Sequence, residues 1–171
     1  EIEIYSIDEA FLGFDGFKNY ELSTYCKYIR EKIKKWVGIP VSIGLSVTKT
    51  LAKIANHLAK KNSYYKGVCI LKNKSTIDKA LAETEIHDVW GIGKRLSILL
   101  EGHNIRTAKD FTLLDRGWIK KNIGVVGEKI YFELQGISCL DLQILPSNKK
   151  SCCVSRSFNK PVEKFNDLEE S

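Results

Sequence analysis

Tyr5-Ser6-Ile7-Asp8-Glu9-Ala10-Phe11 lies inside a run of strand-forming residues, from Ile2 to Phe14, that polar residues interrupt in the middle. The simplest interpretation is two short strands that meet around Asp8 and Glu9. Hard cations such as Mg²⁺ are held by one or two carboxylates together with substrate phosphates, so this pair is a candidate metal site. Neighbouring residues on a regular strand face opposite sides, so both reach one ion only where the backbone bends. An Asp-Glu pair alone is more often plain surface charge.

The residues that follow alternate between helical and strand patterns. Apolar side chains recur every three or four positions from Leu22 to Val37, which predicts an amphipathic helix closed by Gly38 and Pro40. Further patterns predict strands at 41–45 and 67–71 and helices at 48–61 and 76–82. Strands that alternate with helices up to about residue 83 predict an α/β layer, a sheet with helices packed on one face.

The pattern changes after residue 84. Helical segments are predicted near 94–102, 107–113, 115–122 and 125–135, without a strand signal between them. We therefore expect a first domain at 1–84 and an all-helical domain at 85–146. Residues 147–171 are predicted to hold a polar linker and, at 151–158, the first strand of a third domain.

A second group of candidate residues begins the second predicted helix. Ser46 or Thr48 is suited to cap that helix, whose first backbone amides can bind phosphate oxygens. Lys49, Lys53 and Lys60 are four and then seven residues apart, so they line one stripe. Lys49 is thus a candidate to bind a triphosphate, although an ordinary lysine-rich helix face is the more common meaning of this pattern.

The third group is Gly91-Ile92-Gly93-Lys94-Arg95, between two helical segments. Glycines allow a tight turn that brings the backbone close to a phosphodiester, and Lys94 and Arg95 supply positive charge. Gly-Ile-Gly with paired basic residues at a helix start is typical of a helix-hairpin-helix, which positions a duplex without reading its sequence. An ordinary turn between packed helices is the alternative.

Composition and charge limit the class of protein. With 43% hydrophobic and 28% charged residues, the chain of 171 residues is typical of a globular protein. No apolar run approaches the roughly 18 residues of a membrane span, and the first residues do not resemble a signal peptide, so we expect a cytoplasmic protein without a membrane partner. The five cysteines lack zinc-site spacing and are expected to be reduced, buried thiols.

Charge is unevenly distributed along the sequence. Residues 1–25 carry six carboxylates against one lysine, whereas residues 26–74 carry twelve Lys or Arg against Glu31 alone. An acidic segment beside a basic one suits cations on one side and polyanions on the other, although lysines often only solvate helix faces. Charge alone therefore supports equally a protein that binds nucleic acid and one whose lysines only solvate its helix faces.

Four motifs, in this order, resemble the Y-family DNA polymerases. They are Tyr-Ser-Ile-Asp-Glu-Ala-Phe at 5–11, Ser-Ile-Gly-Leu-Ser-Val-Thr-Lys-Thr-Leu-Ala-Lys-Ile-Ala-Asn at 42–56, Val-Trp-Gly-Ile-Gly-Lys-Arg-Leu at 89–96 and Ser-Arg-Ser-Phe at 155–158. The last two favour the UmuC branch (ImpB, MucB and SamB) over the DinB branch. The resemblance implies a partial polymerase palm with a ferredoxin-like sheet, then an all-α helix-hairpin-helix thumb, then the start of a little finger domain.

The resemblance also implies roles for particular residues. Asp8 and Glu9 would be catalytic metal ligands, with two Mg²⁺ ions in the intact enzyme, and Lys49 would contact the triphosphate of the incoming nucleotide. Gly91, Ile92, Gly93, Lys94 and Arg95 would hold the DNA backbone. A further metal-binding aspartate and the fingers domain of the family would precede Glu1, so we expect this stretch alone to be inactive.

The function implied is error-prone, DNA-directed nucleotidyl transfer past damaged bases, within DNA repair and the SOS response. Primer-template DNA and deoxynucleoside triphosphates would be its substrates, and a UmuD-type subunit, RecA and the sliding clamp its protein partners. A non-catalytic helix-hairpin-helix DNA-binding module is the alternative, and a nucleotide cyclase with a palm-like sheet is a third, weaker one. Loss of function on replacing Asp8 and Glu9 distinguishes the polymerase from the binding module.

Overall fold

A hairpin brings Asp8 and Glu9 to a tight bend. In the computed structural model, which describes residues 1–17, 19–145, 151–155 and 157, β1 (Ile2–Ile4) pairs antiparallel with β2 (Ala10–Leu12). The backbone N–H groups of Tyr5 and Ser6 both donate to the Glu9 carbonyl, at 3.0 Å each, and close the turn. The prediction of two short strands that meet around a polar bend is confirmed.

Helix α1 (Leu22–Val37) forms as its apolar period predicts. The Glu21 carboxylate caps its start by accepting from the backbone N–H of Thr24 at 2.6 Å. Gly38 ends it with φ of 77°, a left-handed conformation that glycine adopts without strain. Only Cys26 of this helix is buried, and the other residues of α1 are half-buried or exposed.

Helix α2 (Lys49–Lys61) packs directly on β3 (Ile43–Leu45). The hydroxyl of Thr48 caps the helix by accepting from the Leu51 N–H at 3.3 Å, as one of the two expected caps. A Cβ on Gly44 would lie 2.1 Å from the backbone nitrogen of Asn56, so only glycine permits this close approach. The contact fixes the lysine stripe of α2 relative to the strands.

The strands form two separate pairs. β3 runs parallel to β4 (Val68–Ile70), with Ile43 opposite Val68 and Leu45 opposite Ile70. Within the described residues no ladder joins this pair to the β1–β2 hairpin, so the single expected sheet is divided in two. Helices and strands still alternate over this half of the chain, which confirms the α/β class.

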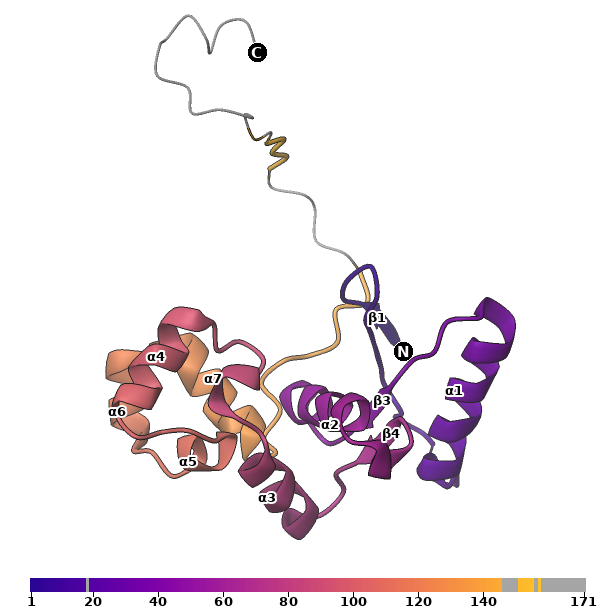
Figure 1. Ribbon diagram of the computed structural model, residues 1–171, viewed down its shortest axis with the longest axis horizontal. Helices are drawn as coiled ribbons and strands as arrows, with labels where there is room; N and C mark the ends of the chain where they lie inside the picture. Colours follow the sequence, from indigo (N-terminus) through magenta and orange to yellow (C-terminus); the bar gives the residue numbers. More distant parts are fainter. Residues whose placement is uncertain (18, 146–150, 156, 158–171) are drawn as a thin grey trace, which may run out of the picture.

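The second half is helical, as predicted. Figure 1 shows α2 and the strands between α1 on one side and the cluster α4 to α7 on the other. The remaining elements are η1 (Ser63–Tyr65), α3 (Lys74–Glu83), η2 (Ile86–Asp88), α4 (Lys94–Gly102), α5 (Ala108–Thr112), α6 (Arg116–Asn122) and α7 (Val125–Leu134).

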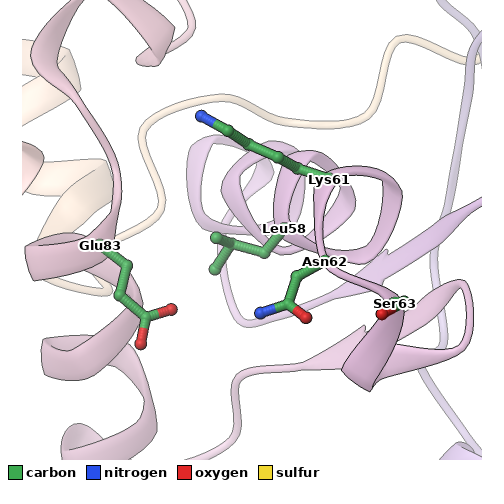
Figure 2. A pocket seen from close by; sticks show the side chains of 5 residues that line it. All are labelled: Leu58, Lys61, Asn62, Ser63 and Glu83. Carbon is green, nitrogen blue, oxygen red and sulfur yellow. The ribbon is translucent and has the colours of Figure 1, made fainter.

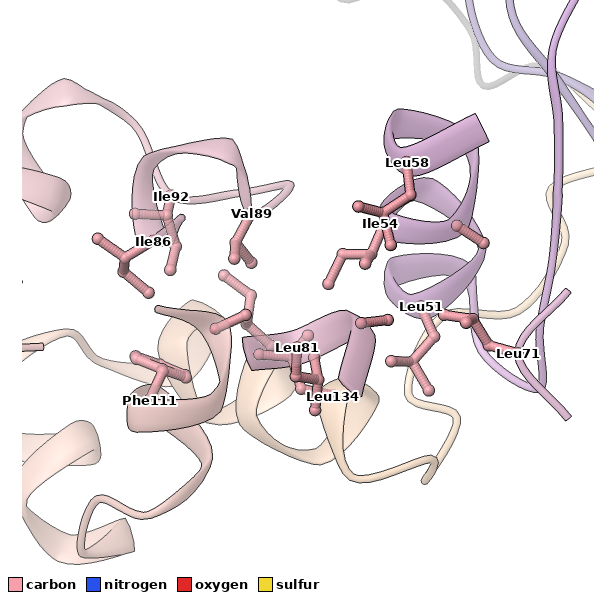
Figure 3. Packing of buried hydrophobic residues seen from close by; sticks show 14 of the residues in the cluster. Leu51, Ile54, Leu58, Leu71, Leu81, Ile86, Val89, Ile92, Phe111 and Leu134 are labelled. Carbon is pink, nitrogen blue, oxygen red and sulfur yellow. The ribbon is translucent and has the colours of Figure 1, made fainter. Parts of the chain in front are cut away.

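One continuous hydrophobic core crosses the predicted domain boundary at residue 84. Leu51 and Ile54 of α2 belong to the same buried cluster as Leu81 of α3 and Phe111 of α5 (Figure 3). Because dispersion and hydrophobic burial scale with contact area, this cluster holds α2 and α3 against the helical half. The domain boundaries themselves stay a prediction.

Two expectations differ from the structure. Residues 151–155 and 157 form no strand, and the rest of the segment predicted at 151–158 lies outside the described residues, as does the linker at 146–150. A strand needs a neighbour to satisfy its backbone groups, and none of the described segments pairs with it.

The cysteines are the second difference. Cys26 and Cys69 are buried free thiols as expected, but Cys152 and Cys153 are exposed. In a separate respect, no helix in the described part of the chain is long and apolar enough to span a membrane.

Candidate active site and nucleic-acid interface

Asp8 and Glu9 have different surroundings at the tip of the hairpin. The Asp8 side chain is exposed and accepts a hydrogen bond from the Ser6 hydroxyl at 2.8 Å. Glu9 is partly buried, and its two carboxylate oxygens lie 2.6 and 2.7 Å from the Lys53 ammonium on α2. The bend thus leaves one carboxylate open to solvent and attaches the other to α2.

The chemistry of this pair fits a hard divalent cation. Asp8 and Glu9 supply oxygen ligands, and Mg²⁺ takes one or two carboxylates and completes its shell with water and substrate phosphates. Among the described residues no three His, Cys, Asp or Glu side chains gather to form a complete site. The pair is therefore suited to a shared site in which a substrate supplies further oxygens.

Lys49 has partners that the sequence did not indicate. Its ammonium forms an ion pair with Glu3 of β1 and donates to the Asp141 carbonyl at 2.7 Å. Burial alone would raise the pKa of Glu3, but hydrogen bonds from Lys49 and from the backbone N–H of Gln143 outweigh it and lower that pKa. Lys49 thus connects β1, α2 and the segment after α7, and a phosphate would have to compete with Glu3 for it.

Three aromatic rings connect the hairpin to the start of the helical half. Tyr5, Phe11 and Trp90 pack with centroid separations of 5.4 to 5.8 Å. The Trp90 indole N–H donates to the Tyr5 hydroxyl at 3.1 Å. Since Trp90 directly precedes Gly91, the turn predicted to hold DNA is tied to the carboxylate hairpin.

Two glycines shape the turn at 91–95, which leads into α4. Gly91 has φ of 91°, which glycine adopts without strain, and Gly93 begins α4 without a side-chain cap. Lys94 and Arg95 are exposed at that helix start. Ile92 differs from its neighbours because its side chain is buried in the core, where it anchors the turn.

A buried carboxylate that sequence reasoning missed joins the two halves. Glu133 of α7 is fully buried and accepts from the backbone N–H of Thr50 at 3.0 Å and of Cys139 at 2.6 Å. Its carbonyl accepts from the Thr48 hydroxyl at 2.8 Å. The start of α2 therefore rests on α7, which explains why the lysine stripe keeps its place beside the hairpin.

A polar cavity of about 370 Å³ lies elsewhere, between the end of α2 and the end of α3 (Figure 2). Leu58, Lys61, Asn62, Ser63 and Glu83 line it. None of these is a predicted site residue. The carboxylates, Lys49 and the 91–95 turn are thus arranged around the surface of the hairpin and not within this cavity.

Comparison with known proteins gives consistent matches over almost the whole chain. Residues 1–57 match the impB/mucB/samB family. Protein UmuC of Salmonella typhimurium is 37% identical over 99% of this chain and 41% of its own length, and Protein MucB of Escherichia coli is 33% identical over the same shares. DNA polymerase IV of Brucella melitensis is 28% identical over 98% of this chain and 37% of its length.

The structural match agrees. DinB of Sulfolobus solfataricus superposes with a TM-score of 0.64 and 25% identity, covering 79% of this chain and 39% of the other. A Dbh ternary complex gives 0.62 and 26% identity over 79% and 40%. The chain spans about two fifths of the length of the curated relatives it matches. It is related to the Y-family DNA polymerases. More narrowly, it is a relative of the UmuC branch, which confirms the resemblance inferred from its four motifs.

Proposed function

We propose that this chain carries part of the active site and the DNA-binding thumb of an error-prone translesion DNA polymerase. The observation that supports it best is the hydrogen bond between Tyr5 and Trp90, which links the hairpin that carries Asp8 to the residue that precedes the 91–95 turn. Carboxylates for a metal and a basic, glycine-containing turn for a phosphodiester are then held in one structural unit.

In the proposed reaction the primer 3′ hydroxyl attacks the α-phosphate of a deoxynucleoside triphosphate and pyrophosphate leaves. Two Mg²⁺ ions, when bound, would supply charge stabilisation to the attacking and leaving oxygens. Asp8 and Glu9 would be their protein ligands in this chain. Lys53 would balance the charge of Glu9, since their contact of 2.6 Å is already present.

Lys49 is proposed to bind the triphosphate, and the turn at 91–95 the backbone of primer-template DNA. For Lys49 this requires exchange of the Glu3 carboxylate for a phosphate oxygen, both being anionic acceptors. Similarity to the UmuC branch further suggests a UmuD-type subunit, RecA and the sliding clamp as protein partners. It also suggests a role in DNA damage tolerance during the SOS response, and a cytoplasmic location.

The test is primer extension past an abasic site, with Mg²⁺ and any partner subunits, by the intact protein that carries this chain. Asp8→Ala with Glu9→Ala should abolish extension and leave duplex binding unchanged. Asp15→Ala is the matched control, because Asp15 is an exposed carboxylate close to the hairpin in sequence. Extension that survives the double substitution would remove both residues from the site. Failure of the unsubstituted protein to extend even an undamaged template would favour the DNA-binding module.

A further inference from the structure

The outer face of α1 carries a row of stacked side chains that the proposed function does not use. The Lys32 ammonium lies 5.2 Å from the Tyr28 ring centroid and 5.1 Å from the Trp36 ring centroid. We call Tyr28, Lys32 and Trp36 the α1 ladder. Spaced four residues apart, they follow one helix face over about 12 Å.

The rings of the ladder are open to solvent. Trp36 is 75% exposed and Tyr28 is 50% exposed, although aromatic side chains usually bury most of their surface. At its amino-terminal end the ladder continues into Tyr25, whose ring lies nearly parallel to that of Tyr28 at 6.2 Å. A cavity of about 190 Å³ lined in part by Phe14, Phe17 and Tyr25 opens there.

The charge around the ladder is positive. Lys27, Lys34 and Lys35 are exposed on α1, and among the described residues none of them, nor Lys32, lies within 4.0 Å of a carboxylate. Arg30 differs because it donates to the Val41 carbonyl at 2.9 Å and thereby holds the fold. Glu31 is the single acidic residue of the helix.

We propose that the α1 ladder binds single-stranded DNA. Exposed aromatic rings stack on bases of any sequence, and flanking lysines attract the phosphate backbone, which is the combination that single-strand binding surfaces use. A duplex fits this face less well, because its bases are already stacked on one another. Figure 1 shows α1 on the opposite side of the strands from α4, so this contact is separate from the 91–95 turn.

The proposal is independent of the metal site, and the experiment keeps the two apart. Anisotropy of a fluorescein-labelled oligothymidylate would be measured with the intact protein in the Lys94→Ala, Arg95→Ala background, so that the turn contributes little. Tyr28→Ala and Trp36→Ala should each weaken binding about 5- to 150-fold, the range for loss of one stacked base. Trp36→Phe should restore most of the affinity, because it restores an aromatic face.

Charge is tested separately. Lys35→Ala should reduce the slope of log affinity against log salt by about 0.7, the value for one single-strand phosphate contact. Lys74→Ala is the matched control, since Lys74 is an exposed lysine on α3, away from the ladder, and should leave the slope unchanged. Circular dichroism would establish that all variants fold.

Two results would overturn the proposal. One is oligothymidylate affinity that is the same with and without Trp36→Ala in the Lys94→Ala, Arg95→Ala background. The other is loss, in the ladder variants, of binding to an acidic protein subunit while oligothymidylate binding persists, which would assign the face to a protein partner. Failure of the polymerase proposal would appear instead in primer extension, which these measurements do not use.

Discussion

The indole N–H of Trp90 donates a hydrogen bond of 3.1 Å to the hydroxyl of Tyr5, across 85 residues of sequence. Their rings also meet edge to face, at 89° and 5.4 Å between centroids. One residue begins the carboxylate bend and the other precedes the turn at Gly91. The pair therefore joins the carboxylate hairpin to the start of the helical half.

A double-mutant cycle on Tyr5→Phe and Trp90→Phe should show this coupling. Both changes keep a ring but remove the hydrogen bond, so we expect a coupling free energy of about 0.5 to 1.5 kcal/mol in urea unfolding. Tyr64→Phe, at a residue 81% exposed, is the control and should have little effect. Strict additivity of the two substitutions would show that the hydrogen bond contributes nothing.

Glu133→Gln should be strongly destabilising. The carboxyl group accepts two backbone N–H groups, one on each oxygen, in a fully buried position, whereas an amide offers one oxygen and places an NH₂ against a donor. We expect the free energy of unfolding to fall by about 1.5 to 3 kcal/mol. Glu128→Gln on the same helix, which loses only a contact with the exposed Arg116, should cost less than about 1 kcal/mol.

Glu3 should make stability depend on pH in acid. Its pKa is lowered in the folded protein, so its contribution is present above the ordinary value of 4.5 and is lost as pH falls through the lowered pKa. The difference in unfolding free energy between native protein and Glu3→Gln should therefore be constant near neutral pH and shrink in acid. A difference that stays the same from neutral to acid pH would contradict the assignment.

Cys69 should make the stability of the protein depend on pH in the alkaline range. Burial raises its pKa from 9.0 to about 11, so the folded state keeps the thiol protonated while the unfolded chain ionises. Its contribution is complete below pH 9 and is lost between about pH 9 and 11, with a slope of at most about 1.4 kcal/mol per pH unit. Cys69→Ala should flatten this decline in the free energy of unfolding.

Thiol alkylation tests the burial of Cys69 directly. Iodoacetamide should modify the exposed Cys152 well before the buried Cys69. The reverse order would show that Cys69 is accessible to the reagent.

Lys94→Ala and Arg95→Ala should weaken duplex binding through charge. Each lost phosphate contact should reduce the salt slope of the affinity by about 0.9, equally for all duplex sequences. Lys79→Ala, at an exposed lysine on α3, is the control. A change confined to particular sequences would indicate contacts with base edges instead.

The helices could be predicted from sequence because their signals are local. Apolar period, the Thr48 cap and the glycine after Val37 placed α1 and α2 within a residue of their bounds. Which side chains of the β1–β2 hairpin are buried could not be predicted in the same way. The alternation of Ile2, Glu3 and Ile4 suggests that the isoleucines face inward, but Glu3 is buried at 6% exposure and Ile4 is 83% exposed.

The reason is that long-range partners determine these positions. Glu3 is buried because Lys49 and the segment around Gln143 reach it, and neither relationship leaves a periodic signal. Glu133 was missed likewise, since its partner Thr50 is 83 residues away. Of the candidate site, Asp8, Glu9 and the 91–95 turn could be named from motifs, whereas the charges that surround Lys49 could not.

The core that passes through Leu51, Leu81 and Phe111 has a consequence for protein engineering. A helical half exchanged between relatives by a cut at residue 84 would leave the apolar sides of α2 and α3 facing a foreign surface. A chimaera that carries everything from β3 to α7 as one block would keep its own packing. The segment that must be exchanged as one block is therefore larger than the helical half alone.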